Sequence, residues 1–260
     1  MKPKTLSFTR GDSFFAAPGL GRKARKEFYS ALSHIFRGPL VGAAGYSDYL
    51  CKGYAGQLSR EQLKQLSRVR DSILRLNSVT DAFLDIIAFD LRLIRPQGGP
   101  CDIRAVLEGM AADFRQSRSP GRGAVSFSGP DRPLPVRMDP HWAQTLLSEL
   151  VSNALLLSDG DGVSLSLYGE RGRVHAEIKC PRSRLPPKGK LRLFLPFFRL
   201  PENLYPQGGR RGGLAMSLVR RIVELHGGII KARRLGRTGF TVKASLPACA
   251  ARGAAKLVPE

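Results

Sequence analysis

The sequence has few cysteines, and their positions exclude two kinds of protein. Its four cysteines are Cys51, Cys101, Cys180 and Cys249. They lie about 50 or more residues apart, so the chain has no Cys-x-x-Cys pair. This spacing argues against a zinc site and against a disulfide framework, and it favours a reducing compartment.

Long apolar runs are also missing. No stretch approaches the roughly 18 consecutive apolar residues that a membrane-spanning helix needs. Three basic residues within the first ten precede the apolar run Phe14–Ala17, which is too short for the core of a secretory signal peptide. We therefore expect a soluble, cytoplasmic protein whose chain contains no transmembrane sensor.

Acidic residues are scarce relative to basic ones. The chain has 42 Lys and Arg but 21 Asp and Glu, a formal net charge of +21. Such a charge favours nucleic acid, an anionic membrane or an acidic protein surface as a partner, or it reflects a general richness in arginine. Because no aromatic-rich basic strand or recognition-helix pattern stands out, we do not expect nucleic acid.

The first part of the chain has the periodicity of two long helices. Residues 1–21 mix Gly, Pro and Ser and are expected to form a flexible lead-in. A first amphipathic helix is predicted over 22–50. A second is predicted to begin with a capping box, in which Ser59 is the N-cap and Gln62 its partner, and to continue to about Ile94.

The second predicted helix carries an apolar seam. Its members recur at heptad-like spacing: Leu63, Leu66, Ile73, Leu76, Phe83 and Ile87. Two antiparallel helices have too little mutual surface to be stable alone, and a second copy would bury both seams in a four-helix bundle. We therefore predict a homodimer through a dimerisation and phosphotransfer domain over 22–96. Packing of the hairpin against its own C-terminal half is the alternative.

The second half is predicted to alternate short helices and strands. Helices are expected over 102–117, 142–157 and 213–226, and strands over 125–128, 163–168, 174–179, 229–233 and 240–246. Asp139 followed by Pro140 is typical of a helix start. Helices on one face of a mostly antiparallel sheet make an α/β sandwich, so the predicted fold class is α+β. This domain is assigned to residues 101–247, with a tail over 248–260.

Residues 33–40 read Ser-His-Ile-Phe-Arg-Gly-Pro-Leu. This segment resembles the phosphoacceptor box of sensor histidine kinases, S-H-E-x-R-x-P-L. The resemblance makes His34 the candidate phosphoacceptor, with Arg37 and Pro39 as its motif partners. Pro39 is expected to kink the helix and hold the imidazole outward, where its neutral ring can attack a phosphoryl group. A surface histidine without chemistry is the alternative.

Two positions of this box depart from the family pattern. The acid that follows the histidine in the family is Ile35 here, and the polar residue that positions water for phosphatase action is Gly38. General-base help is typically worth ~10²–10⁴-fold, so the resemblance implies weak autokinase and phosphatase activities. Phosphotransfer requires less, because a response regulator is expected to supply the acceptor Asp, the metal and a lysine.

The second half resembles the ATP-binding domain of the same kinases. Residues 149–154 resemble its N box, 193–199 its F box, and 213–228 its second glycine box with the helix that follows. The resemblance covers about residues 25–247 when the histidine box is included. It implies that a nucleotide site contains four residues of this chain: Glu149, Asn153, Gly213 and Leu214. It also implies that Asn153 helps to hold Mg²⁺.

Both glycine boxes depart from the family. The first, D-x-G-x-G, aligns onto 180–184, so Cys180 replaces the adenine-binding Asp, and Arg182 and Arg184 replace glycines. In the second, only the glycine at Gly213 remains. Losing a base-reading hydrogen bond costs ~1–3 kcal/mol, and added side-chain bulk costs more. We therefore expect weak or no binding of ATP and Mg²⁺, although a surplus of Lys and Arg over residues 181–237 favours triphosphate.

Three functions are compatible with these features. The first is a degenerate histidine-kinase-like protein that relays a phosphoryl group between His34 and the Asp of a response-regulator receiver domain, with an upstream sensor as a further partner. The second is an active, atypical ATP-dependent sensor histidine kinase. The third is a non-catalytic basic scaffold that binds an acidic protein or nucleic acid. ATP labelling of wild type and His34→Ala separates the first two, and salt-dependent DNA binding tests the third.

Overall fold

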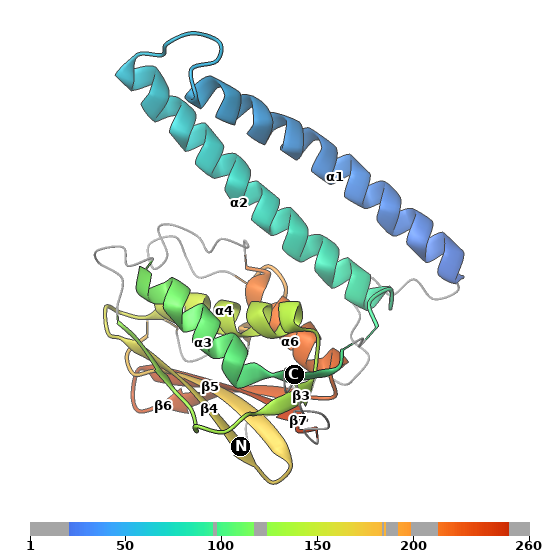
Figure 1. Cartoon of the computed structure of the whole chain (residues 1–260), viewed down its shortest axis with the longest axis vertical. Helices are drawn as coiled ribbons and strands as arrows, with labels where there is room; N and C mark the ends of the chain where they lie inside the picture. Colours follow the sequence, from blue (N-terminus) through green and yellow to red (C-terminus); the bar gives the residue numbers. More distant parts are fainter. Residues whose placement is uncertain are drawn as a thin grey trace, which may run out of the picture. The chain divides into compact units, whose positions relative to one another are not determined.

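The computed structural model describes residues 21–95, 98–116, 124–183, 185, 192–198 and 213–249. The chain folds as two compact units (Figure 1): one contains helices α1 and α2, and the other contains all strands and the remaining helices. Most of the predicted lead-in and tail, residues 1–20 and 250–260, lies outside the described residues. Among the described helices, none combines the length and the apolar character of a membrane span.

The first unit is an antiparallel pair of long helices, as predicted. α1 spans Arg22–Cys51 and α2 spans Arg60–Asp90, and the two pack along each other (Figure 1). The capping box is confirmed, because the Gln62 amide donates to Ser59 Oγ at 3.2 Å and the Ser59 amide donates to Gln62 Oε1 at 2.8 Å. Pro39 lies inside α1 and does not end it.

The second helix ends earlier than the predicted Ile94. Arg92 has a φ of 55°, the left-handed conformation that usually terminates a helix. The amides of Arg92 and Leu93 donate back to the carbonyls of Phe89 and Ala88 at 3.0 and 2.9 Å. This Schellman-type ending satisfies carbonyls of the last turn, and it uses an arginine where the sequence offers no glycine.

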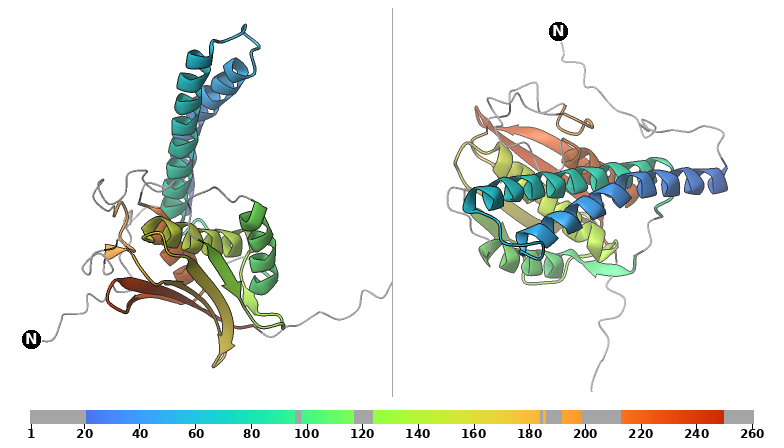
Figure 2. Two further views of the ribbon diagram at one scale, coloured as in Figure 1. Left: turned by 90° about the vertical axis from the view of Figure 1, so that its left-hand side faces the viewer. Right: turned by 90° about the horizontal axis from the view of Figure 1, so that it is seen from above.

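The second unit is an α/β sandwich. Its main sheet contains β2 (Val125–Ser128), β4 (Val163–Glu170), β5 (Arg173–Cys180), β7 (Gly239–Pro247) and β6 (Ile229–Leu235), in that spatial order. Helices α3 (Ile103–Gln116), α4 (Pro140–Leu157) and α6 (Ala215–Leu225) cover one face of this sheet (Figures 1 and 2). Neighbouring strands are antiparallel except β2 and β4, so the predicted sandwich of mostly antiparallel strands is confirmed.

Two short strands and one helix start differ from the prediction. β1 (Pro100–Asp102) pairs with β3 (Pro135–Arg137) in a separate two-stranded sheet, and helix α3 begins at Ile103 instead of residue 102. The Asp102 carboxylate accepts hydrogen bonds from the amides of Arg104 and Leu134, at 3.1 and 2.8 Å. Three-residue strands are too short to show alternation, and the bond to Leu134 forms only in the folded chain.

Turn and cap chemistry explains how α4 and the β4–β5 hairpin form. The Asp139 side chain accepts from the His141 amide at 2.8 Å, which confirms the predicted N-cap of α4. Arg171 and Gly172 both have positive φ, 49° and 70°, as a tight type I′ hairpin turn requires. The apolar face of α4 packs on β4 and β5 and buries Leu146 and Leu150 completely or nearly so.

Candidate functional site

His34 lies on the solvent-exposed surface of α1, one turn before Arg37. Residues three apart on a helix are surface neighbours, so the Arg37 side chain lies next to the imidazole of His34. The Arg37 guanidinium donates from Nε and Nη2 to Asp81 Oδ1 on α2, at 3.3 and 3.2 Å. This half-exposed ion pair adds little stability, but it restricts the arginine to the face that joins the two helices.

The residue after the histidine is exposed and apolar. Ile35 exposes 64% of its surface at the position where the family has an acid, and Val41, six residues further along α1, exposes 67%. Phe36 is turned toward α2, where its ring meets Phe83 edge-on with centroids 6.2 Å apart. The surroundings of His34 therefore consist of a cation and exposed aliphatic groups, and Ile35 offers no base.

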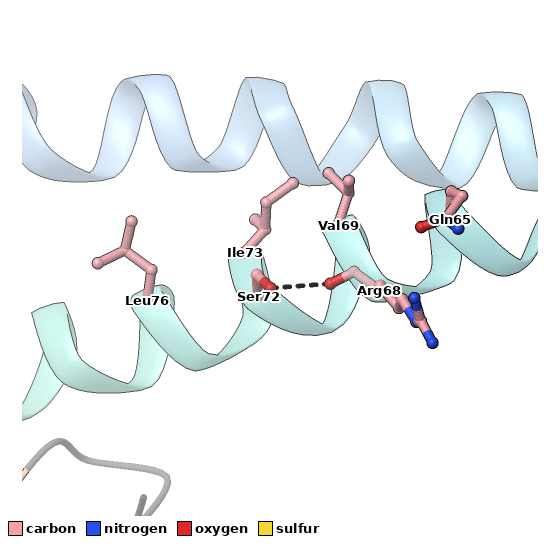
Figure 3. Close-up of a pocket in the computed structure, with 6 residues that line it drawn as sticks. All are labelled: Gln65, Arg68, Val69, Ser72, Ile73 and Leu76. Atoms are coloured by element: carbon pink, nitrogen blue, oxygen red, sulfur yellow. Dashed lines mark hydrogen bonds between the residues drawn. The ribbon is translucent and has the colours of Figure 1, made fainter. Parts of the chain in front are cut away.

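An apolar groove of about 400 Å³ lies on α2 (Figure 3). It is lined by Gln65, Arg68, Val69, Ser72, Ile73 and Leu76. Ser72 turns its hydroxyl away into the helix and donates to the Arg68 carbonyl at 2.8 Å. Val69 and Leu76 expose about half of their surfaces, 51% and 52%. Part of the predicted seam is therefore uncovered in a single chain.

The N-box residues lie together on α4. Asn153 Nδ2 donates to the Glu149 carbonyl at 2.8 Å and to Glu149 Oε2 at 3.3 Å, so the two side chains share one turn of the helix. Carboxylate and amide oxygens are the ligands that Mg²⁺ prefers. In the described ranges, no group of three His, Cys, Asp or Glu residues could hold a metal ion. Glu149 and Asn153 together could therefore provide two ligands for a Mg²⁺ ion bound to nucleotide phosphates.

Cys180, which the sequence aligns with the adenine-binding Asp of the family, is buried. Cys180 ends β5 with none of its surface exposed, and its Sγ donates to the Arg182 carbonyl at 3.0 Å. Burial, reinforced by the charge of Asp161, raises the pKa of the Cys180 thiol to about 11. A neutral thiol that already donates to the backbone is a poor acceptor for an adenine amino group.

The segment after Cys180 is tied to neighbouring loops. Arg182 Nε lies 3.7 Å from Asp161 Oδ2, and the Arg182 carbonyl accepts from the Asp159 amide at 3.2 Å. Gly239 packs so closely that a Cβ there would lie 2.6 Å from the Cys180 carbonyl oxygen. These contacts hold the 180–182 segment against the loop before β4 and the start of β7. Two other altered glycine-box positions, Arg184 and Arg211, lie outside the described residues.

The remaining predicted nucleotide residues directly precede α6. Gly213 has a φ of 84°, a conformation that favours glycine, and Leu214 is buried. Of the F box, residues 193–198 are described, and Phe197 is half-exposed with a φ of 59°. Positive φ is rare for an aromatic residue, and it turns the chain sharply inside this motif.

The burial of Cys180 leads to a prediction about thiol reactivity. In the native protein, iodoacetamide at pH 8 should alkylate the partly exposed Cys51 and Cys249 but leave Cys101 and Cys180 unmodified. Burial is the main cause that raises the pKa of both protected thiols, and the thiolate is the reactive form. Peptide mass spectrometry measures each site, with urea-unfolded protein as the control. Modification of Cys180 as fast as Cys51 would show that this position is open.

Comparison with known proteins agrees with this architecture. Residues 138–249 match the family model described as histidine kinase-, DNA gyrase B- and HSP90-like ATPase. These residues form an ATPase-like α/β domain of this kind. The histidine protein kinase DivJ of Caulobacter vibrioides is 28% identical over 86% of this chain, and the circadian input-output histidine kinase CikA of Synechococcus elongatus is 25% identical over 86%. The chain is thus similar to histidine kinases over most of its length.

Solved structures show the same fold. Full-length ShkA, crystallised with AMPPNP, superposes with a TM-score of 0.70 at 22% identity and covers 86% of this chain. The histidine kinase AdeS of Acinetobacter baumannii superposes with a TM-score of 0.57 at 16% identity and covers 82%. The chain spans 37% of DivJ, 30% of CikA and 46% of the ShkA chain. An ATPase-like domain preceded by a helical region is thus shared with known histidine kinases.

Two residues of the candidate site were not found by sequence reasoning. Asp81, which binds Arg37, is 44 positions away in the chain, and no motif connects the two. Asp161, which pairs with Arg182, lies in the loop before β4 of the ATPase-like domain. Isolated acidic residues at such separations carry no local pattern, so only the folded chain identifies these partners.

Proposed function

We propose that this protein transfers phosphoryl groups in two-component signalling. His34 carries the phosphoryl group, which it exchanges with the Asp of a response-regulator receiver domain. The observation that carries the proposal is the exposed imidazole within a histidine box on a long helical hairpin. In the transfer, a neutral ring nitrogen attacks phosphorus, an N–P bond forms, and the acyl-phosphate O–P bond breaks to release the Asp carboxylate.

Arg37 has a supporting role in this proposal. A phosphoryl group on His34 would bring two negative charges within reach of a cation one helical turn away. Charge-assisted hydrogen bonds to phosphoryl oxygens are stronger than the half-exposed pair with Asp81. Arg37 would therefore exchange Asp81 for the phosphoryl group when His34 is modified.

The same proposal includes weakened nucleotide binding. The contacts of the buried Cys180 and the ion pair between Arg182 and Asp161 support this part, because the sequence aligns both positions with the family's first glycine box. When bound, ATP with Mg²⁺ would supply a phosphoryl donor, and Glu149 and Asn153 are the residues placed to hold its metal end. The proposed transfer from a receiver domain needs neither group.

We further propose a homodimer through the helical domain over residues 22–96. The exposed groove on α2 and the aliphatic residues exposed on α1 support this proposal, because water-exposed apolar surface of this kind is normally covered. A second copy brings the same seam and would complete a four-helix bundle. An upstream sensor and a cytoplasmic location belong to the same overall proposal.

Charges placed in the groove should dissociate this dimer. Val69→Asp combined with Leu76→Asp puts two carboxylates into surface that the dimer would bury, and an unpaired buried charge is strongly unfavourable. Light scattering at ~10 µM should report a dimer for wild type and a monomer with unchanged helical circular dichroism for the variant. Lys64→Asp, on the same helix outside the groove, is the control. A folded wild-type monomer would contradict the dimer.

A direct labelling experiment tests the proposed activity. The protein is incubated either with [γ-³²P]ATP or with receiver domains that carry ³²P-labelled aspartyl phosphate. The proposal expects fast labelling from a cognate receiver domain and little or none from ATP. Fast labelling from ATP would instead favour an active, atypical kinase, and the absence of labelling from every receiver domain of the same genome would contradict phosphotransfer.

A further inference from the structure

The sheet face that the helices leave uncovered is rich in basic and hydroxyl side chains. Strand register aligns them in rows, one with Ser166, Glu177, Lys243 and Lys231 and the next with Ser164, Lys179, Thr241 and Arg233. These residues alternate along the strands with the buried, helix-facing ones. The number of cations per strand is highest on β6, the last strand of the sheet.

The acidic residue of these rows is already engaged. Glu177 accepts hydrogen bonds from the Tyr168 hydroxyl at 3.4 Å and from Thr241 Oγ1 at 3.2 Å. Lys179 Nζ lies 3.9 Å from the same carboxylate. The contacts of Glu177 are thus with residues of β4, β5 and β7, and not with the cations of β6.

Lys231 and Lys243 are directly opposite each other on β6 and β7. Like charges at such positions are destabilising. Lys243 extends the other way, with Nζ 5.0 Å from the centroid of the Tyr168 ring. Lys231 and Arg233 are exposed, and no acidic residue of the described ranges forms an ion pair with either. An anion bound beside β6 would balance the charges of Lys231 and Arg233.

β6 also has a free backbone edge. It pairs with β7 on one side, and no strand of the described part pairs with its other side (Figure 1). An edge strand offers unpaired N–H and C=O groups, which an extended peptide can join as an additional strand. Ile229, at the start of β6, exposes 52% of its surface and would add an apolar contact.

We propose that β6 binds an acidic, extended segment of a partner protein by strand addition. Acidic side chains at every second position of that segment would face the same side as Lys231 and Arg233, at the spacing of about 7 Å that residues two apart have in a strand. This inference concerns a surface on the ATPase-like domain and is independent of phosphoryl transfer at His34.

The geometry favours a peptide over nucleic acid. A phosphodiester backbone has acceptors but no donors, so it cannot pair with the carbonyl groups of the β6 edge. The Tyr168 ring is covered by Lys243 on one side and lies against His175, with centroids 5.0 Å apart, so it offers no open platform for a base. An extended peptide satisfies both the charges and the backbone edge.

Fluorescence anisotropy with the full chain and a fluorescein-labelled (Glu-Val)₄ peptide tests the proposal. We expect saturable binding that Lys231→Glu with Arg233→Glu weakens at least tenfold. Lys26→Glu with Lys52→Glu changes the net charge equally but lies on the helical hairpin, and it should leave binding within twofold of wild type. His34→Ala should bind the peptide normally, which separates this surface from the phosphotransfer proposal.

Three outcomes would overturn the inference. A peptide N-methylated at every residue keeps its charges but loses all backbone donors for strand pairing, so unchanged affinity would exclude strand addition. Tighter binding of single-stranded DNA or phosphatidylserine vesicles, with the same dependence on Lys231 and Arg233, would identify a general polyanion surface. If the peptide does not bind, the basic residues of β6 would be explained as charges that protect an edge strand from aggregation. Slower hydrogen exchange of β6 amides in the peptide complex would support the proposal.

Discussion

His34→Ala should lose all detectable phosphoryl acceptance from a phosphorylated receiver domain. The proposed reaction needs an exposed imidazole nitrogen, and alanine has no nucleophile to replace it. His34 is exposed on α1, so the substitution removes no buried contact and the helix should keep its stability. Acid-labile, base-stable ³²P labelling after mixing with labelled receiver domains measures the reaction.

A matched control makes this result specific. His141 is also exposed, at the start of α4, and His141→Ala should accept phosphoryl groups as wild type does. Arg37→Ala should slow transfer while Arg37→Lys restores most of it, because a positive charge one turn from the imidazole is retained. Acid-labile labelling of His34→Ala at the wild-type level would place the phosphoryl group on another residue and contradict the proposal.

Ile35→Glu separates autokinase from transfer activity. It restores the acid that the family uses as a base, on a residue that is already exposed and so does not disturb packing. Any labelling from ATP should rise, whereas the rate of transfer from a receiver domain should change little, because only the former lacks its base.

Mg-ATP should bind with a dissociation constant above about 10 µM. The buried Cys180 thiol replaces an acceptor for the base, and one lost base-reading hydrogen bond costs ~1–3 kcal/mol, or roughly tenfold in affinity per 1.4 kcal/mol. The side chains of Arg182 and Arg184, at positions where the family has glycines, should weaken binding further. Isothermal titration calorimetry measures this constant, and a value at or below about 10 µM would contradict the proposed degeneration.

Restoring the family residues should strengthen binding at a cost in stability. Cys180→Asp with Arg182→Gly and Arg184→Gly supplies the acceptor and removes bulk, but it buries a carboxylate near Asp161 after the ion pair of that residue is lost. Desolvation raises the pKa of a buried carboxyl, so thermal stability of the variant should fall as pH rises from the ordinary Asp pKa to the raised pKa of the folded state. Cys180→Ser, without a charge, is the control, and melting curves show whether weak binding reflects an unfolded pocket.

Local chemistry made much of the fold predictable. The Ser59–Gln62 capping box and the Asp139 N-cap involve residues two or three positions apart, so short sequence patterns determine them. Alternation in β4 and β5, with one buried face, likewise predicted a hairpin. The histidine box depends on residues within one helix, so the sequence alone identifies it.

By itself, then, the sequence determined the long helices, the main strands, the excess of positive charge and the motif around His34, because each depends on neighbours along the chain or on composition. Only the tertiary structure decided which distant groups meet. It paired Arg37 with Asp81 across two helices, directed the Cys180 thiol onto the Arg182 carbonyl inside a closed strand end, and made β6 an open edge lined by Lys231 and Arg233. Such contacts join segments whose separation along the chain carries no pattern, and their geometry exists only after the sheet and helices have packed.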